Sequence, residues 1–146
     1  MLTQLENAGK VVGVKQTEKG MRALVSRTRP GLVSRLFENE VPEIFDGTVE
    51  IKSVAREAGS RTKMAVISHD ENVDAVGACI GQRGTRVANI VEELAGEKID
   101  IVEYSDDVAT FIGAALAPAK VLGVDMDPSG EKACKVTVPD AQLSLA

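Results

Sequence analysis

The sequence predicts an α+β domain in which a three-stranded sheet is covered by helices on one face. Helical periodicity appears on both sides of a glycine pair, Gly81 and Gly84. Alternating apolar residues at 49–56 and 63–69 are typical of strands, and isoleucines near residue 100 mark a third strand. A hydrophobic content of 44% supports a packed core and argues against wholesale disorder.

The stretch before residue 28 is predicted to be a β-hairpin. Short apolar runs from Lys10 to Val14 and from Met21 to Val25 flank a polar turn at residues 16–20. Two strands alone are only marginally stable in water. We therefore expect residues 1–27 to be a leftover hairpin or a frayed arm.

The first helix of the predicted domain begins at Pro30, because proline is favoured in the first helical turn. Its apolar face is expected to continue through a second short turn that Asp46-Gly47 closes. The residues on this face are Leu32, Val33, Leu36, Phe37, Val41, Ile44 and Phe45. In the strand that follows, one face is expected to carry Val49, Ile51, Ser53 and Ala55. A turn at residues 58–60 leads to the second strand, in which Met64 and Val66 are expected to face the core.

The chain is organised around the stretch from Asp74 to Tyr104, which reads as a short helix, a Gly-Gln-Arg-Gly turn, a longer helix and a strand. The apolar face of the longer helix is formed by Val87, Ile90, Val91 and Leu94, and Gly96 is expected to end it. Glycine has no Cβ and lets another backbone approach closely. The amides that open the next helix attract phosphate. The same glycines would serve equally well in a simple helix–helix turn.

After Tyr104 the pattern begins again. Asp106 and Asp107 are expected to open a helix that Pro118 ends. Its apolar face would consist of Val108, Phe111, Ile112, Ala115 and Leu116. Residues 120–126 and 132–138 read as a second hairpin, and residues 140–146 as the start of another apolar helix.

The charge distribution limits the kind of nucleic acid contact that the chain can make. Its net charge is −5, yet residues 1–69 hold 11 Lys and Arg against 8 Asp and Glu, whereas residues 70–146 hold 6 against 14. This asymmetry permits a local basic face. Because few phosphates can be neutralised, any nucleic acid contact is expected to be short. An aromatic content of 3% argues against a broad base-stacking platform.

Enzyme chemistry is not indicated. The glycine spacing fits neither a dinucleotide-binding nor a triphosphate-binding loop. His69, the only histidine, has no metal-ligand partner at helical spacing. Cys79 and Cys134 are expected to be reduced thiols. With no signal sequence and no apolar run of roughly 18 residues, we expect a cytoplasmic protein that binds no membrane, metal, cofactor or small-molecule substrate.

Three blocks around the glycine loop carry a family resemblance: residues 26–33 (SRTRPGLV), 41–49 (VPEIFDGTV) and 55–61 (AREAGSR). Together with the helix–GxxG–helix arrangement, they resemble the KH-domain region of the bacterial NusA family, factors of transcription elongation, termination and antitermination. The resemblance covers nearly the whole chain.

The resemblance implies a prokaryotic-type (type II) KH domain at residues 28–105. Residues 1–27 would then be the end of a partial OB-type barrel, present as a hairpin or arm. Residues 106–146 would be the first half of a second KH module that lacks its GxxG loop. The chain thus resembles a KH region truncated at both ends.

The resemblance also implies that the GxxG loop, Gly81-Gln82-Arg83-Gly84, binds single-stranded RNA. Gln82 and Arg83 would contact phosphate or sugar at its tip. Ile80 and Val87 would flank a groove for bases, with Gly77, Ala78 and a residue of the adjacent strand as weaker candidates. Arg86 could add a phosphate contact or pair with a neighbouring acid. Arg61 and Lys63 could also contact phosphate, and the alternative for each is an exposed side chain that is simply solvated. The RNA would be nascent transcript, and RNA polymerase and other transcription factors would be further partners.

An alternative interpretation is a protein-docking module. In that case the acidic half of the chain contacts RNA polymerase or another transcription factor, and the GxxG loop is only a turn. Salt dependence separates the two interpretations, because RNA binding weakens as salt rises.

Overall fold

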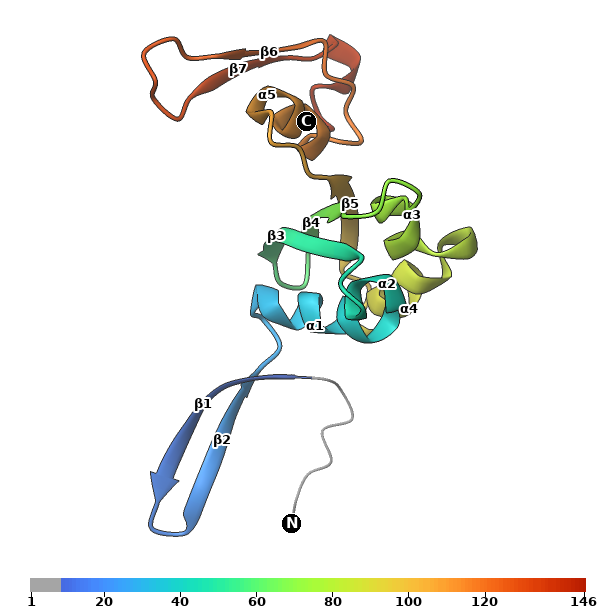
Figure 1. Cartoon of the computed structure of the whole chain (residues 1–146). Coiled ribbons are helices and arrows are strands. Elements are labelled where there is room, and N and C mark those ends of the chain that lie inside the picture. The colour runs from blue at the N-terminus through green and yellow to red at the C-terminus, as the bar shows by residue number, and fades with distance from the viewer. Residues whose placement is uncertain (1–8) are drawn as a thin grey trace.

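The structure is a computed structural model that describes residues 9–146. The predicted N-terminal arm therefore falls partly outside the described residues. Figure 1 shows three parts along the chain: an N-terminal hairpin, a central domain of helices and strands, and a C-terminal unit beyond strand β5.

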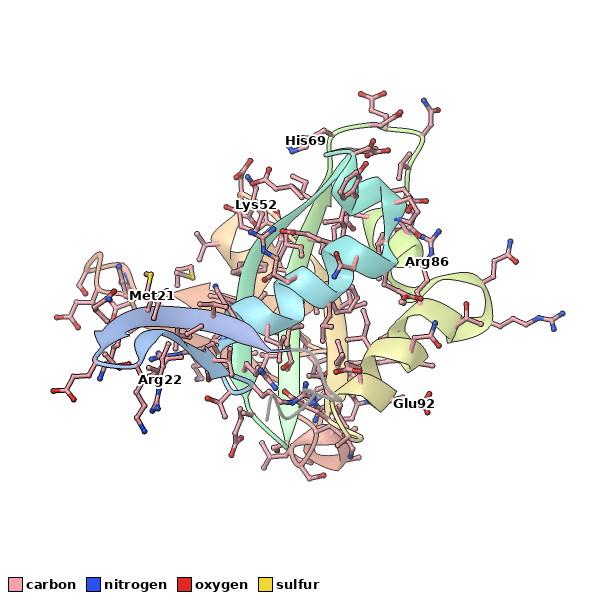
Figure 2. The ribbon with its side chains drawn as sticks, turned by 90° about the horizontal axis from the view of Figure 1, so that it is seen from below. Met21, Arg22, Lys52, His69, Arg86 and Glu92 are labelled. Carbon is pink, nitrogen blue, oxygen red and sulfur yellow. The ribbon has the colours of Figure 1, made fainter. Side chains whose placement is uncertain are left out.

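The N-terminal hairpin consists of β1 (Lys10–Thr17) and β2 (Gly20–Ser26), which pair antiparallel. The predicted hairpin is confirmed, and its strands are longer than expected. Met21 and Arg22 lie on opposite sides of the ribbon (Figure 2), as alternation along a strand requires. Apolar side chains on this hairpin remain exposed, and 72% of the surface of Met21 is accessible to solvent. The hairpin therefore adds little to the buried core.

The central domain confirms the predicted fold class. Its helices are α1 (Pro30–Glu40), α2 (Pro42–Phe45), α3 (Ala75–Ile80) and α4 (Thr85–Glu93). Its strands are β3 (Val49–Glu57), β4 (Arg61–Ser68) and β5 (Lys98–Glu103), in the order β3-β4-β5. β3 runs antiparallel to β4, whereas β5 runs parallel to it. The helices pack on one side of this sheet (Figure 1), and the residues they bury there are Leu32, Val33, Phe37, Val41, Val49, Met64, Val66, Ala75, Cys79, Ile90 and Leu94.

The alternation predicted for β3 is wrong beyond Ile51. The pairing register with β4 shifts between Ile51 and Ser53, so one extra residue reverses the faces that follow. Val54 now packs against the core, and Ser53 and Ala55, expected beside Val49, are exposed. The bulge also turns Arg56 inward, where its side chain is 4% exposed.

Phe45 is a second correction. It was expected to continue the apolar face of the first helices, but 82% of its surface is exposed. Helix α2 is a single turn that ends at Phe45, and Ile44 takes the position against the core instead.

A buried ion pair joins the sheet to the segment that precedes β5. Arg56 donates from Nε and Nη2 to the two carboxylate oxygens of Glu97, both at 2.8 Å, and the Glu97 side chain is 1% exposed. Thr62 donates a third hydrogen bond to this carboxylate at 2.8 Å. Nη1 of Arg56 donates to the carbonyls of Arg27 and Arg29 at 2.6 and 2.9 Å. One guanidinium thus holds β3, the entry to β5 and the entry to α1 together.

The C-terminal unit contains α5 (Val108–Ala115), β6 (Gly123–Met126) and β7 (Cys134–Thr137). Asp107 caps α5 by accepting a hydrogen bond from the Thr110 amide at 2.9 Å. The terminal apolar helix predicted at residues 140–146 is wrong: only a 3-10 turn, η2 (Asp140–Gln142), forms. Leu143 and Leu145 stay exposed, so no apolar surface supports a longer helix. Among the described residues, no helix has the length and apolar character needed to cross a membrane.

Replacing Arg56 with Met is expected to lower the free energy of unfolding by about 3–5 kcal/mol, because the Glu97 charge stays buried without its partner. Arg61→Met, which removes the partly exposed pair with Asp100, serves as the control and should cost under about 1 kcal/mol. Urea titrations measure both values. Equal losses for the two variants would show that the Arg56–Glu97 pair has no special role.

The same pair predicts a dependence of stability on pH. Hydrogen bonds from Arg56, and then those from Thr62 and the Gly59 amide, lower the pKa of Glu97 from 4.5 to about 2 against the opposing effect of burial. Because the folded-state pKa is depressed, this stabilisation is complete above pH 4.5 and is lost as pH falls toward 2. Its full size is about 3 kcal/mol. Urea unfolding from pH 6 to pH 2.5 should give a shallower pH dependence for Glu97→Gln than for the parent chain, and identical slopes would contradict the assignment.

Candidate nucleic-acid interface

The loop between α3 and α4 has an unusual backbone. Gly81, Arg83 and Gly84 all have positive φ, at 77°, 55° and 75°. The Gly84 amide donates to the Gly81 carbonyl at 3.1 Å, which closes the turn. Gln82 and Arg83 are exposed at its tip. Arg83 adopts a left-handed conformation that costs a non-glycine residue of order 1 kcal/mol or more.

Gly81 is required for a second reason. A Cβ at this position would lie 2.7 Å from Cγ of Arg86. The Arg86 side chain folds back across Gly81, and its Nη1 donates to the Ala78 carbonyl at 2.7 Å and to Oε2 of Glu43 at 2.9 Å. The Arg86 side chain therefore braces the loop against α2 and α3.

These contacts bear on the two roles considered for Arg86. Its guanidinium, labelled in Figure 2, is half-buried and paired with the acid Glu43, which matches the ion-pair alternative. A direct phosphate contact by Arg86 stays a prediction.

An apolar groove of about 290 Å³ lies beside the loop. The structure brings Ile80 and Val87 together there, and it identifies Ile99 and Ile101 as the residues of the adjacent strand. The other lining residues are Asp100, Val102, Ala117 and Pro118. Ile80 is 37% exposed, a high value for an isoleucine and one that leaves its side chain accessible from the groove. Gly77 and Ala78 instead line a separate hollow with Glu43, Gln82 and Arg86.

Two further candidate cations, Arg61 and Lys63, form hydrogen bonds with other groups of the protein. Nε of Arg61 donates to Oδ2 of Asp100 at 2.6 Å. Nζ of Lys63 donates to the carbonyls of Ala115 and Ala117. Neither partner of Lys63 could be predicted from the sequence, because both lie more than 50 residues away along the chain. The same is true of Ala117 and Pro118 as groove residues, since Pro118 was expected only to end a helix.

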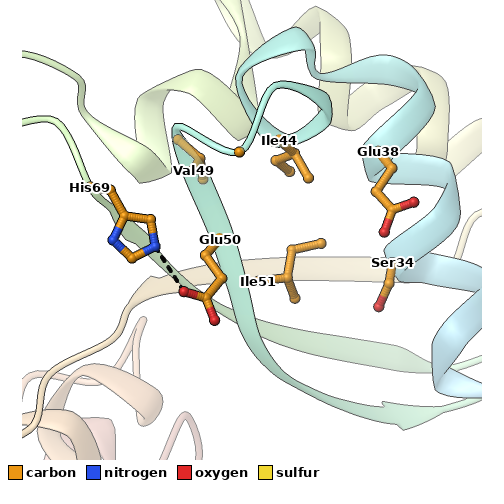
Figure 3. A pocket seen from close by; sticks show the side chains of 8 residues that line it. Ser34, Glu38, Ile44, Val49, Glu50, Ile51 and His69 are labelled. Carbon is orange, nitrogen blue, oxygen red and sulfur yellow. Dashed lines mark hydrogen bonds and ion pairs between the residues drawn. The ribbon is translucent and has the colours of Figure 1, made fainter.

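Among the described residues, His69 and Cys79 have different surroundings. Figure 3 shows His69 beside Glu50 at the rim of a hollow between α1 and β3, with Nε2 of His69 2.8 Å from Oε2 of Glu50. Burial raises the pKa of the Cys79 thiol to about 12, so it is a poor nucleophile. Within residues 9–146, no group of three His, Cys, Asp or Glu side chains is placed to hold a metal ion.

Comparison with known proteins places this chain in a family. Residues 27–104 match the family model of the NusA-like first KH domain. The chain is 58% identical over 136 residues to the transcription termination/antitermination protein NusA of Bacillus subtilis, covering 93% of this chain and 36% of that protein. It is 55% identical to the same protein of Halalkalibacterium halodurans over 93% of this chain and 35% of the relative. For Thermus thermophilus the identity is 48%, over 91% of this chain and 34% of the relative. The chain thus spans about a third of the length of these relatives.

Substitution of Gly81 tests the packing of the loop. Gly59→Ala, at φ +82° with no atom within 4 Å of the new Cβ, should lower the free energy of unfolding by about 1–2 kcal/mol through backbone strain alone. Gly81→Ala should cost more, because it also displaces Arg86. In an Arg86→Ala background, which removes Cγ and Cδ, the Gly81→Ala cost should fall toward the Gly59 value. Urea unfolding of the four variants measures this coupling, and an unchanged cost would show that Arg86 does not constrain Gly81.

Proposed function

Since this chain belongs to the NusA-like first KH domain family, we propose that it binds single-stranded RNA through residues Gly81–Gly84. The observation that carries the proposal is the juxtaposition of an exposed, positive-φ glycine loop with an apolar groove on one side. The loop supplies polar contacts for the backbone, and the groove suits the faces of bases.

The phosphate contacts are assigned to the loop and to the start of α4. The Thr85 amide donates to the Gln82 carbonyl, and no side chain caps the start of α4, so the positive end of the helix dipole at this loop favours an anionic ligand. Gln82 and Arg83 add a polar side chain and a cation at the exposed tip. Arg86 supports this arrangement from within through its bonds to Ala78 and Glu43.

Base contacts are assigned to the groove. Ile80 and Val87 form its helical side, and Ile99 and Ile101 form its strand side. A KH-type site of this kind holds about four nucleotides. Polar contacts to phosphate position the RNA, whereas contacts to bases determine sequence preference.

The names of the relatives suggest the setting. They are transcription termination/antitermination proteins rather than enzymes, in agreement with the prediction that the chain is not an enzyme. We infer that the RNA is nascent transcript and that the chain works in the cytoplasm as part of a factor for transcription elongation, termination and antitermination. RNA polymerase and other transcription factors are its proposed protein partners.

The double variant Gln82→Asp/Arg83→Asp should lower affinity for short single-stranded RNAs at least about tenfold, because it removes a cation and places two carboxylates against phosphate. Ser129→Asp/Lys132→Asp makes the same change of charge in the exposed loop between β6 and β7 and should bind like the parent chain. Fluorescence anisotropy at several salt concentrations measures both affinity and salt slope. The slope should fall by about 0.7 for each phosphate that the variant no longer neutralises.

Two results would contradict the proposal. If the folded Gln82→Asp/Arg83→Asp variant keeps its affinity, the loop is not the RNA site. If the parent chain binds no RNA at low salt, the protein-docking interpretation is favoured, with the GxxG loop serving only as a turn.

A further inference from the structure

The segment that follows α5 is fixed to the second face of the central sheet. Lys63 points away from the core, because its neighbours Met64 and Thr62 are fully buried on the helix-covered side. From that second face its Nζ donates to the carbonyl of Ala115, the last residue of α5, and to that of Ala117 at 2.9 Å. Carbonyls at a helix C-terminus have no partner within the helix, and a cation there is favourable. Lys63 therefore ties residues 115–117 to this face of the sheet.

The same segment lines the groove beside the glycine loop. Ala117 and Pro118 line it together with Ile80 and Val87, although they lie outside the residues that match the KH family model. Ala119, immediately after them, is buried, as are Ala65 and Val102 on β4 and β5, and none of these three belongs to the main core cluster. The groove is thus built from two parts of the chain.

The lining of the groove indicates which part of an RNA it takes. Seven of its eight lining residues are apolar, and the exception, Asp100, is an acid already bound by Arg61. A carboxylate repels phosphate, whereas apolar side chains suit the face of a base. A volume of about 290 Å³ lies at the lower end of the roughly 300–1,000 Å³ typical of ligand pockets, which suits a small flat group.

We propose that Ala117 and Pro118 form one wall of a subsite for one RNA base, and that Lys63 is the positioning residue that holds this wall in place. The inference rests on the proposed RNA binding at Gly81–Gly84. It makes base recognition depend on residues beyond the KH domain, and it assigns Lys63 a role other than phosphate contact.

Lys63→Met and Lys52→Met provide matched variants of the full chain for the test. Each removes one cation from the sheet, but Lys52 pairs with Glu50 on β3, lies over the ring of Tyr104 and does not line the groove. Lys63→Met should weaken binding of short single-stranded RNAs about three- to tenfold with an unchanged salt slope, whereas Lys52→Met should leave affinity unchanged. Lys63→Arg, which can still donate to two carbonyls, should restore most of the affinity.

Abasic substitutions in the RNA locate the subsite. In the parent chain, removing the base at one position should weaken binding. Pro118→Gly should cause a similar loss with the intact RNA, and the two changes together should cost no more than either alone, because they remove the same contact. Pro118 is exposed, so this variant remains informative if Lys63→Met fails to fold.

A fall of about 0.7 in the salt slope for Lys63→Met would identify Lys63 as a phosphate contact and overturn the inference. Additive losses for Pro118→Gly and the abasic RNA at every position would also overturn it. Failure of RNA binding by the parent chain, or unchanged binding by Gln82→Asp/Arg83→Asp, would overturn the proposed function as well. Loss of binding in that loop variant together with normal binding by Lys63→Met and Pro118→Gly would overturn the inference alone.

Discussion

The central domain depends on the ion pair between Arg56 and Glu97. A buried charge pair is tolerated only when hydrogen bonds satisfy both groups, and here the carboxylate accepts bonds from Arg56, Thr62 and the Gly59 amide. Among the described residues, no buried side-chain nitrogen or oxygen lacks a hydrogen-bond partner. The pair fixes the residue that immediately precedes β5, and β5 supplies the strand side of the groove. The pair therefore helps to position the strand side of the groove from the start of β5.

The cations around the candidate site are of two kinds: most are bound by protein groups, and one is exposed at the tip of the loop. Arg86, Arg61 and Lys63 all have protein partners, and each holds an element that borders the loop or the groove. Arg83 is the exposed cation at the tip of the loop itself. For the proposed RNA contact, an exposed arginine beside the positive end of α4 suits a short contact with few phosphates, and it accords with a net charge of −5.

The bulge in β3 connects the fold to this arrangement. One extra residue after Ile51 reverses the strand, so that Val54 joins the core and Arg56 reaches Glu97. A regular strand would have turned Arg56 to solvent and left Glu97 buried without a cation. A period-two sequence pattern does not reveal this bulge, yet the Arg56–Glu97 ion pair depends on it.

The sequence by itself determined the features that arise from short-range patterns. Helical periodicity around Gly81 and Gly84, alternation in β4 and the turn residues of the first hairpin are sufficient to predict the fold class. Adjacency along the chain is sufficient to place Ile80 and Val87 beside the loop. The tertiary structure decided what depends on partners distant in the chain. Arg56 and Glu97 are 41 residues apart, and Lys63 and Ala117 are 54 apart. It also decided that Phe45 and residues 140–146 find no apolar surface to pack against. The physical reason is that local backbone preferences are encoded within one or two turns, whereas ion pairs, bulges and groove walls depend on which distant segments the folded core brings together.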